Sequence, residues 1–124
     1  MMAKSINWPS QFLEAVQAEP QQVSFIALRL GSLYYDNQYW VPDEVVDIRV
    51  NHQVIRKGQV VAPVRLTTVG ALTPREFEQL KVPLKTVLAV IEYLQHTYQP
   101  EDPVTEQTII TVVEYTNLDF VLAE

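Results

Sequence analysis

The chain contains no cysteine. It therefore has no disulfide, no thiol nucleophile and no cysteine-ligated zinc site. Only three glycines occur, and Gly31, Gly58 and Gly70 lie too far apart to form a phosphate-cradling loop. No apolar run approaches the roughly 18 residues of a membrane helix, so we expect no membrane insertion. Residues 1–8 lack the apolar core of a secretory signal, and we therefore expect a cytoplasmic protein.

Basic residues are also few: 9 Lys and Arg stand against 15 Asp and Glu, giving a formal net charge of −6. Nucleic acid would be repelled at long range, so we do not expect it as the partner. The stretch 49–75 is nevertheless basic, and it defines a candidate basic patch of Arg49, Arg56, Lys57 and Arg65. Two interpretations remain open for this patch. Its charges either lie on solvated or paired faces, or they steer an acidic partner.

The composition, with 48% hydrophobic and 19% charged residues, predicts a folded single domain over residues 1–124. Residues 1–7 are expected to be flexible. The patterns predict an α+β fold with a short N-terminal helix over residues 9–18 and one long helix packed on a curved, mainly antiparallel sheet. The predicted strands cover residues 23–30, 33–41, 45–50, 60–69 and 108–115, with turns at 31–32 and 57–58.

Two of these strands carry clear patterns. Residues 45–50 alternate, with Val46, Ile48 and Val50 on one face, as in a half-buried strand. Residues 108–115 are almost continuously apolar and β-branched, which predicts a central strand covered on both faces. Pro63 should bend the strand 60–69 or place it at an edge.

The strongest helix signal is Thr73-Pro74-Arg75-Glu76, which has the form of a capping box with proline at the first helical position. It predicts a short helix over 74–80 and, after a break at Val82-Pro83, a long helix over 83–98. The apolar stripe of the long helix consists of Leu84, Val87, Leu88, Ile91, Leu94 and Tyr98. Truncating Leu88 or Ile91 to alanine should then cost roughly 2–5 kcal/mol.

Aromatic residues gather in one place, at Tyr34, Tyr35, Tyr39 and Trp40. Tyrosine and tryptophan are enriched at binding hot spots, so the group is a candidate protein-binding face. Packing in the core and at the sheet edge, or stacking of nucleic-acid bases, are the other interpretations. The apolar tail over 117–124, with Leu118 and Phe120, either closes the domain's own sheet or docks on another chain or a second copy.

No arrangement of residues predicts catalysis. The two histidines, His52 and His96, have no accompanying nucleophile or ligand set, and we predict no metal site and no cofactor. The acidic cluster of Asp43, Glu44 and Asp47 is expected to form a solvated turn.

The order of elements resembles that of the ASCH group of PUA-like small barrels, through residues 12–30, 57–60, 64–69 and 104–115. That resemblance implies nucleic-acid binding or a small hydrolase. The Gly-x-Lys-x-x-Glu-x-Arg signature of the family is absent, because the corresponding stretch begins Ala18-Glu19-Pro20, and no residue role carries over. The size and acidity are also similar to those of small dimeric secretion-type chaperones. Our leading hypothesis is a non-catalytic adaptor or assembly factor that binds another protein or a second copy; the alternative is the PUA-like module.

Overall fold

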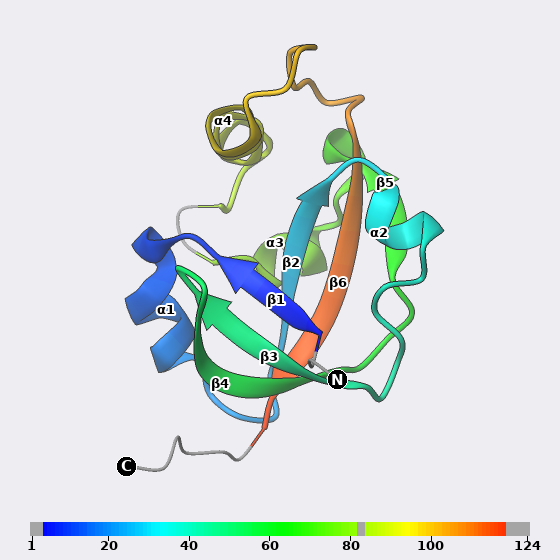
Figure 1. Ribbon diagram of the computed structural model, residues 1–124. Helices are drawn as coiled ribbons and strands as arrows, with labels where there is room; N and C mark the ends of the chain where they lie inside the picture. Colours follow the sequence, from blue (N-terminus) through cyan, green and yellow to red (C-terminus); the bar gives the residue numbers. More distant parts are fainter. Residues whose placement is uncertain (1–3, 82–83, 119–124) are drawn as a thin grey trace.

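The computed structural model describes residues 4–81 and 84–118 and forms a single small α+β domain with a mixed six-stranded sheet (Figure 1). The strands are β1 (Ser5–Trp8), β2 (Ser24–Leu30), β3 (Val45–Val50), β4 (Gln53–Val60), β5 (Arg65–Thr68) and β6 (Ile109–Asn117). The helices are α1 (Leu13–Ala18), α2 (Leu33–Asp36), α3 (Pro74–Gln79) and α4 (Val87–Tyr98), with short 3₁₀ turns at Ser10–Phe12 and Val69–Ala71.

The strands follow the order β1-β3-β4-β6-β2, and β5 pairs with β6 off this path. The pairings β2–β6, β3–β4, β4–β6 and β5–β6 are antiparallel, whereas β1 runs parallel to β3. β6 is central, as its β-branched run predicted. One of its edges pairs with β2, and the other is shared between β5 and β4.

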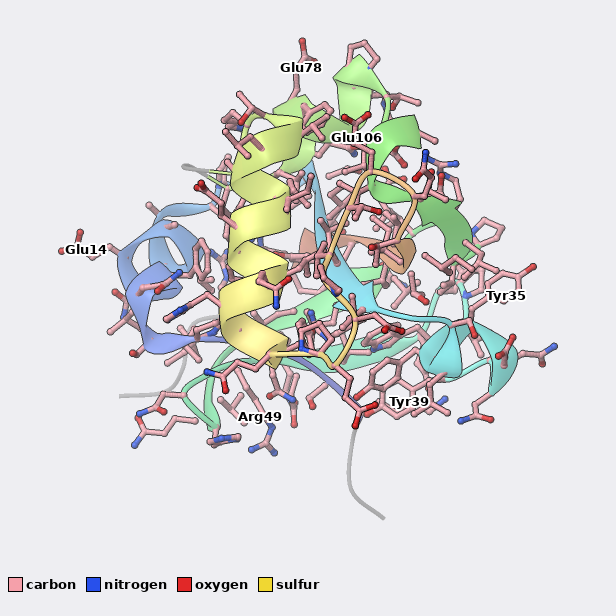
Figure 2. All side chains as sticks on the ribbon, turned by 90° about the horizontal axis from the view of Figure 1, so that it is seen from above. Glu14, Tyr35, Tyr39, Arg49, Glu78 and Glu106 are labelled. Carbon is pink, nitrogen blue, oxygen red and sulfur yellow. The ribbon has the colours of Figure 1, made fainter. Side chains whose placement is uncertain are left out.

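The sheet is strongly curled, so that β1 and β2 approach each other across the open seam (Figure 1). Arg29 of β2 spans the seam by donating from Nη2 to the backbone oxygen of Asn7 in β1 at 2.8 Å. The core fills the inside of this curl with fully buried side chains, among them Ile6, Ile48 and Tyr115. α4 crosses one end of the curled sheet (Figures 1 and 2).

Strand β1, Ser5–Trp8, begins inside the segment 1–7 that the sequence predicts to be flexible, and it pairs with β3 in register. Alternation explains this, because Ile6 and Trp8 are buried while Asn7 is exposed. The predicted helix over 9–18 is confirmed as a 3₁₀ turn followed by α1.

The expected turn at Lys57-Gly58 is wrong, because both residues lie inside β4. The β3–β4 hairpin turns at Asn51 and His52, which both have positive φ (50° and 68°), as a two-residue hairpin loop requires. Gly58 is needed for close packing instead, since a Cβ there would stand 2.9 Å from Ile48 Cδ1.

The expected strand over residues 33–41 is also wrong, because Leu33–Asp36 form α2. Tyrosine favours strands, but local hydrogen bonds prevail here. Ser32 Oγ donates to Asp36 Oδ2 at 2.8 Å, and Gly31, at φ 82°, redirects the chain at the end of β2. The predicted strand over 60–69 is divided, since β4 ends at Val60 and β5 begins only at Arg65, after Pro63.

The capping box of α3 is confirmed by both reciprocal hydrogen bonds between Thr73 and Glu76. The single long helix from residue 83 is not borne out in full. Residues 84–86 are not helical, and α4 begins at Val87, where Thr86 Oγ1 accepts from the Ala89 N–H. The break predicted at Val82-Pro83 lies outside the described residues.

The expected burial of Leu88 is wrong, since this side chain is 64% exposed. Val90 and Leu94 are the buried residues of α4. None of the helices in the described part of the chain has the length and apolar character needed to cross a membrane.

Candidate functional site

The aromatic group divides into an internal cluster and a surface residue. Tyr34 stacks on Trp40 at 4.8 Å between ring centroids, and Tyr39 meets Trp40 edge-on at 5.0 Å. Trp40 is buried and donates from Nε1 to the backbone oxygen of Ser5, while the Ser5 N–H donates to Tyr39 Oη. The rings of Tyr34, Tyr39 and Trp40 therefore hold β1 against α2 and the loop that follows it. Tyr35 lies apart from them on α2, 43% exposed, at the outer edge of the molecule in Figure 2.

A groove of about 420 Å³ lies beside this surface residue. We call it the α2 groove, and its lining is Tyr35, Asp36, Gln38, Trp40, Val41, Pro42, Pro63 and Val64. Two local features shape it. Gln38, at φ 50°, turns the chain back after α2, and Pro63 interrupts strand pairing between β4 and β5. Val41 is 46% exposed in this groove, so an apolar wall faces solvent.

Acidic residues adjoin the α2 groove along the segment that contains α2. Between Arg29 and Arg49 there is no lysine or arginine, whereas Asp36, Asp43 and Glu44 all occur there. Asp36 is the one charged residue in the lining. Glu44 is paired with Lys4 at 3.2 Å, and Arg65, which follows the lining residue Val64, is paired with Glu76. Among the described residues beside the groove, Asp36 and Asp43 are therefore the acids outside an ion pair. The groove combines apolar contact area with this local negative charge.

Of the predicted tail residues, only Leu118 is described. Its N–H donates to the backbone oxygen of Lys57 at 3.1 Å, and its side chain is half-buried. Leu118 thus continues the pairing of β6 with β4. Phe120 lies outside the described residues, so it is not placed relative to the α2 groove.

Two residues of the candidate basic patch lie together around one buried carboxylate. Lys57 forms an ion pair with Asp47, its partner in the β3–β4 register. Arg49 Nη2 lies 3.8 Å from the other oxygen of Asp47 and donates from Nη1 to the backbone oxygen of His52. Both cations therefore neutralise an internal acid as well as facing solvent.

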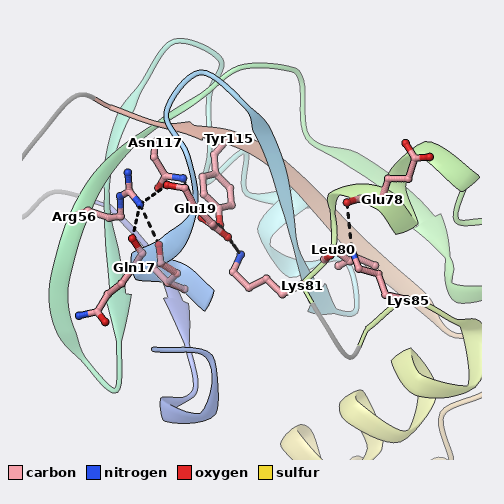
Figure 3. Close-up of polar contacts among 10 residues, drawn as sticks. Gln17, Glu19, Arg56, Glu78, Leu80, Lys81, Lys85, Tyr115 and Asn117 are labelled. Carbon is pink, nitrogen blue, oxygen red and sulfur yellow. Dashed lines mark hydrogen bonds and ion pairs between the residues drawn. The ribbon is translucent and has the colours of Figure 1, made fainter. Parts of the chain in front are cut away.

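The other two residues of the patch are engaged elsewhere. Arg56 caps the C-terminus of α1, donating from Nη1 to the backbone oxygens of Val16 at 3.0 Å and Glu19 at 2.8 Å (Figure 3). Arg65 lies on β5 and binds both carboxylate oxygens of Glu76. Each of the four predicted basic residues thus has an internal structural partner.

A buried polar cluster was not foreseen from the sequence. It consists of Glu19 after α1, Lys81 after α3, and Tyr115 and Asn117 on one face of β6 (Figure 3). Lys81 Nζ pairs with Glu19 and donates to Tyr115 Oη at 2.8 Å, and Asn117 Nδ2 donates to Glu19 Oε1 at 2.9 Å. The available signal was a lysine, Lys81, set between apolar Leu80 and Val82, but spacing alone did not reveal its distant partners.

Burial dominates the electrostatics of this cluster. Loss of solvation lowers the pKa of Lys81 to about 8, although the negative charge of Glu19 opposes the shift. Burial, reinforced by Glu19, raises the pKa of Tyr115 well above its ordinary value. The Lys81 ammonium also lies 3.7 Å from the centroid of the Trp8 ring. The Lys81 side chain is only 2% exposed, and its contacts with Glu19, Tyr115 and Trp8 join the segment after α3 to the end of α1, to β6 and to β1.

Within residues 4–81 and 84–118, no group of three or more His, Asp or Glu side chains is arranged to hold a metal ion. Comparison with family models, with curated proteins and with solved structures gives no significant match. The assignment of function therefore depends on the geometry described above.

Proposed function

We propose that the protein is a non-catalytic adaptor or assembly factor that binds another protein through the α2 groove. The occupant is a short apolar segment of the partner, flanked by lysine or arginine. The observation that carries the proposal is the exposed apolar lining of the groove next to the acidic residues Asp36 and Asp43.

The apolar part of the groove supplies the contact energy. Tyr35 and Val41 are 43% and 46% exposed, and two prolines extend the same lining. Prolines and ring-packed loops lose little conformational freedom on binding, which favours association. The neighbouring Trp40 is held rigidly by its contacts with Tyr34 and Tyr39, so the floor of the groove is preformed.

The charge of the groove selects the class of partner. Asp36 in the lining and Asp43, which follows the lining residue Pro42, favour a cationic segment and disfavour an acidic one. Glu44 adds little, because it is already paired with Lys4. The net charge of −6 acts in the same direction at longer range. This arrangement also disfavours nucleic acid at the groove, because its phosphates would meet the acidic residues.

Val41→Ser tests the proposal with little risk to the fold, because Val41 is half-exposed. Removing its apolar contact should weaken partner capture from a native lysate about 5–10-fold. Val23→Ser is the matched control, since Val23 is 44% exposed but lies outside the lining. Equal capture by the two variants at unchanged thermal stability would reject the groove as the docking site.

A further inference from the structure

A second pocket, of about 330 Å³, is lined by residues from the ends of β1 and β2, from α2, from the turn of the β3–β4 hairpin and from α4. It is separate from the α2 groove, and the two linings share no residue. Four of its walls are aromatic: Trp8, Tyr34, Tyr93 and Tyr98. The pocket is held by the fold, since the N–H of Asn51 in the hairpin turn donates to the backbone oxygen of Trp8 at 3.0 Å.

Arg29 is the one Lys, Arg, Asp or Glu residue in this lining. The residue is only 9% exposed, so its guanidinium is largely removed from bulk water. Its described contacts are with neutral groups. Nη1 donates to the backbone oxygen of Leu28 and Nη2 to that of Asn7, both at 2.8 Å, and the guanidinium carbon lies 5.7 Å from the Trp40 ring.

This arginine has no carboxylate partner in the described part of the chain, where the ion pairs involve other residues. A guanidinium has five N–H donors, and the two backbone bonds leave the others available. Burying a cation without a counter-charge is costly, and backbone oxygens offset only part of that cost. In an acidic chain, a buried arginine without an acid indicates that the counter-charge comes from a ligand.

We propose that this pocket binds a small aromatic carboxylate. The carboxylate accepts hydrogen bonds from the free donors of Arg29, whose planar fork matches its two oxygens. The flat body of the ligand contacts the aromatic part of the lining, Trp8, Tyr34, Tyr93 and Tyr98. The absence of Asp and Glu from the lining removes repulsion against the anion. This site is independent of the proposed docking of a protein partner.

The probe is benzoate, titrated into the isotope-labelled full chain and followed by backbone amide NMR. Saturable shifts should appear at the pocket residues Asn51, His52, Thr97 and Tyr98 and not at the α2 groove. Benzamide is the matched probe, since it has nearly the same shape without the charge. Its binding should be at least about tenfold weaker, because it loses the charge-assisted hydrogen bonds to Arg29.

Two variants complete the test. Arg29→Lys retains the positive charge but loses the bidentate fork, and it should weaken benzoate binding about tenfold. Tyr98→Ala removes one aromatic residue of the lining and should also weaken benzoate binding. Because Tyr98 is half-exposed, this variant should keep the fold, so it tests the pocket even if Arg29→Lys does not fold. Equal affinity for benzoate and benzamide, shifts outside the pocket, or no saturation by about 10 mM benzoate would overturn the proposal.

Discussion

Lys81 and Glu19 form an ion pair in the interior, with side chains only 2% and 4% exposed. The pair joins the segment after α3 to the end of α1, and Tyr115 Oη accepts from Lys81 Nζ and donates to Glu19 Oε1. These contacts hold three distant segments together on the inner side of β6.

Removing one partner of the pair should be strongly destabilising. Glu19→Gln leaves the Lys81 ammonium buried without its counter-charge, and the free energy of unfolding in urea at neutral pH should fall by about 3–5 kcal/mol. The double variant Glu19→Gln/Lys81→Met removes both charges and should recover much of that loss. Arg75→Ala is the control: it breaks an ion pair with Glu114 in which Arg75 is 67% exposed, and should cost less than about 1 kcal/mol.

The depressed pKa of Lys81 predicts a rise in stability at alkaline pH. Between about 8 and the ordinary 10.5, the unfolded chain binds the lysine proton more tightly than the folded chain does. The free energy of unfolding should therefore increase across this window by on the order of 1 kcal/mol per pH unit. The cost of burying the charged amine is fully present below pH 8.

The measurement is the difference in unfolding free energy between the natural chain and Glu19→Gln/Lys81→Met at several pH values, because titrations of groups outside the buried cluster cancel in it. Above pH 10 the raised pKa of Tyr115 opposes the effect, since the unfolded tyrosine then loses its proton first. A difference that stays flat from pH 8 to 10 would show that Lys81 titrates normally.

Glu76 gives the opposite dependence, at acidic pH. Burial alone would raise the pKa of its carboxyl, but hydrogen bonds from Arg65 and from the Thr73 N–H bring it below the ordinary 4.5. Its stabilisation is therefore complete above pH 4.5 and is lost as the pH falls through the lower folded value. Glu76→Gln should cost about 1 kcal/mol at neutral pH, and the cost should shrink in acid. A cost independent of pH would contradict this.

Two leucines of α4, Leu94 and Leu88, differ in burial and should therefore differ in their contribution to stability. Leu94 is fully buried, and Leu94→Ala should lower the free energy of unfolding by about 2–5 kcal/mol through cavity formation. Leu88 on the same helix is 64% exposed, and Leu88→Ala should change the free energy of unfolding by less than about 0.5 kcal/mol. Equal effects in chemical denaturation would mean that α4 presents a different face to the core.

The burial of residues along α4 also shows a limit of prediction from sequence patterns. Helical spacing identified an apolar stripe but not which edge of it faces the core, because Val90 lies outside the stripe and is buried while Leu88 lies within it and is exposed. Local signals performed well when the chemistry was local, as at the capping box of Thr73 and Glu76. Strand propensity failed at α2, where a serine hydroxyl bond to Asp36 favours a turn of helix.

The candidate sites were less accessible to sequence reasoning because their parts come from distant segments. The sequence identified the aromatic group. It could not show that Tyr39 and Trp40 are held inside by hydrogen bonds with the backbone of Ser5 in β1, whereas Tyr35 stays on the surface. The pairing of Lys81 with Glu19 joins two segments that are far apart in the sequence, and it has no local signature. The same holds for Arg29, whose isolation from acids becomes visible only when β1, β2 and α4 are brought together.

Photo-crosslinking from position 35 tests the docking proposal most directly. A benzophenone amino acid replaces Tyr35 at the rim of the α2 groove, and in a separate protein it replaces Leu88, which is 64% exposed and outside that groove. The account predicts that position 35 crosslinks in a native lysate to a discrete protein through a segment with apolar and basic residues, and that position 88 does not. Crosslinking to a second copy of the chain, identical products from both positions, or no product from position 35 would contradict it.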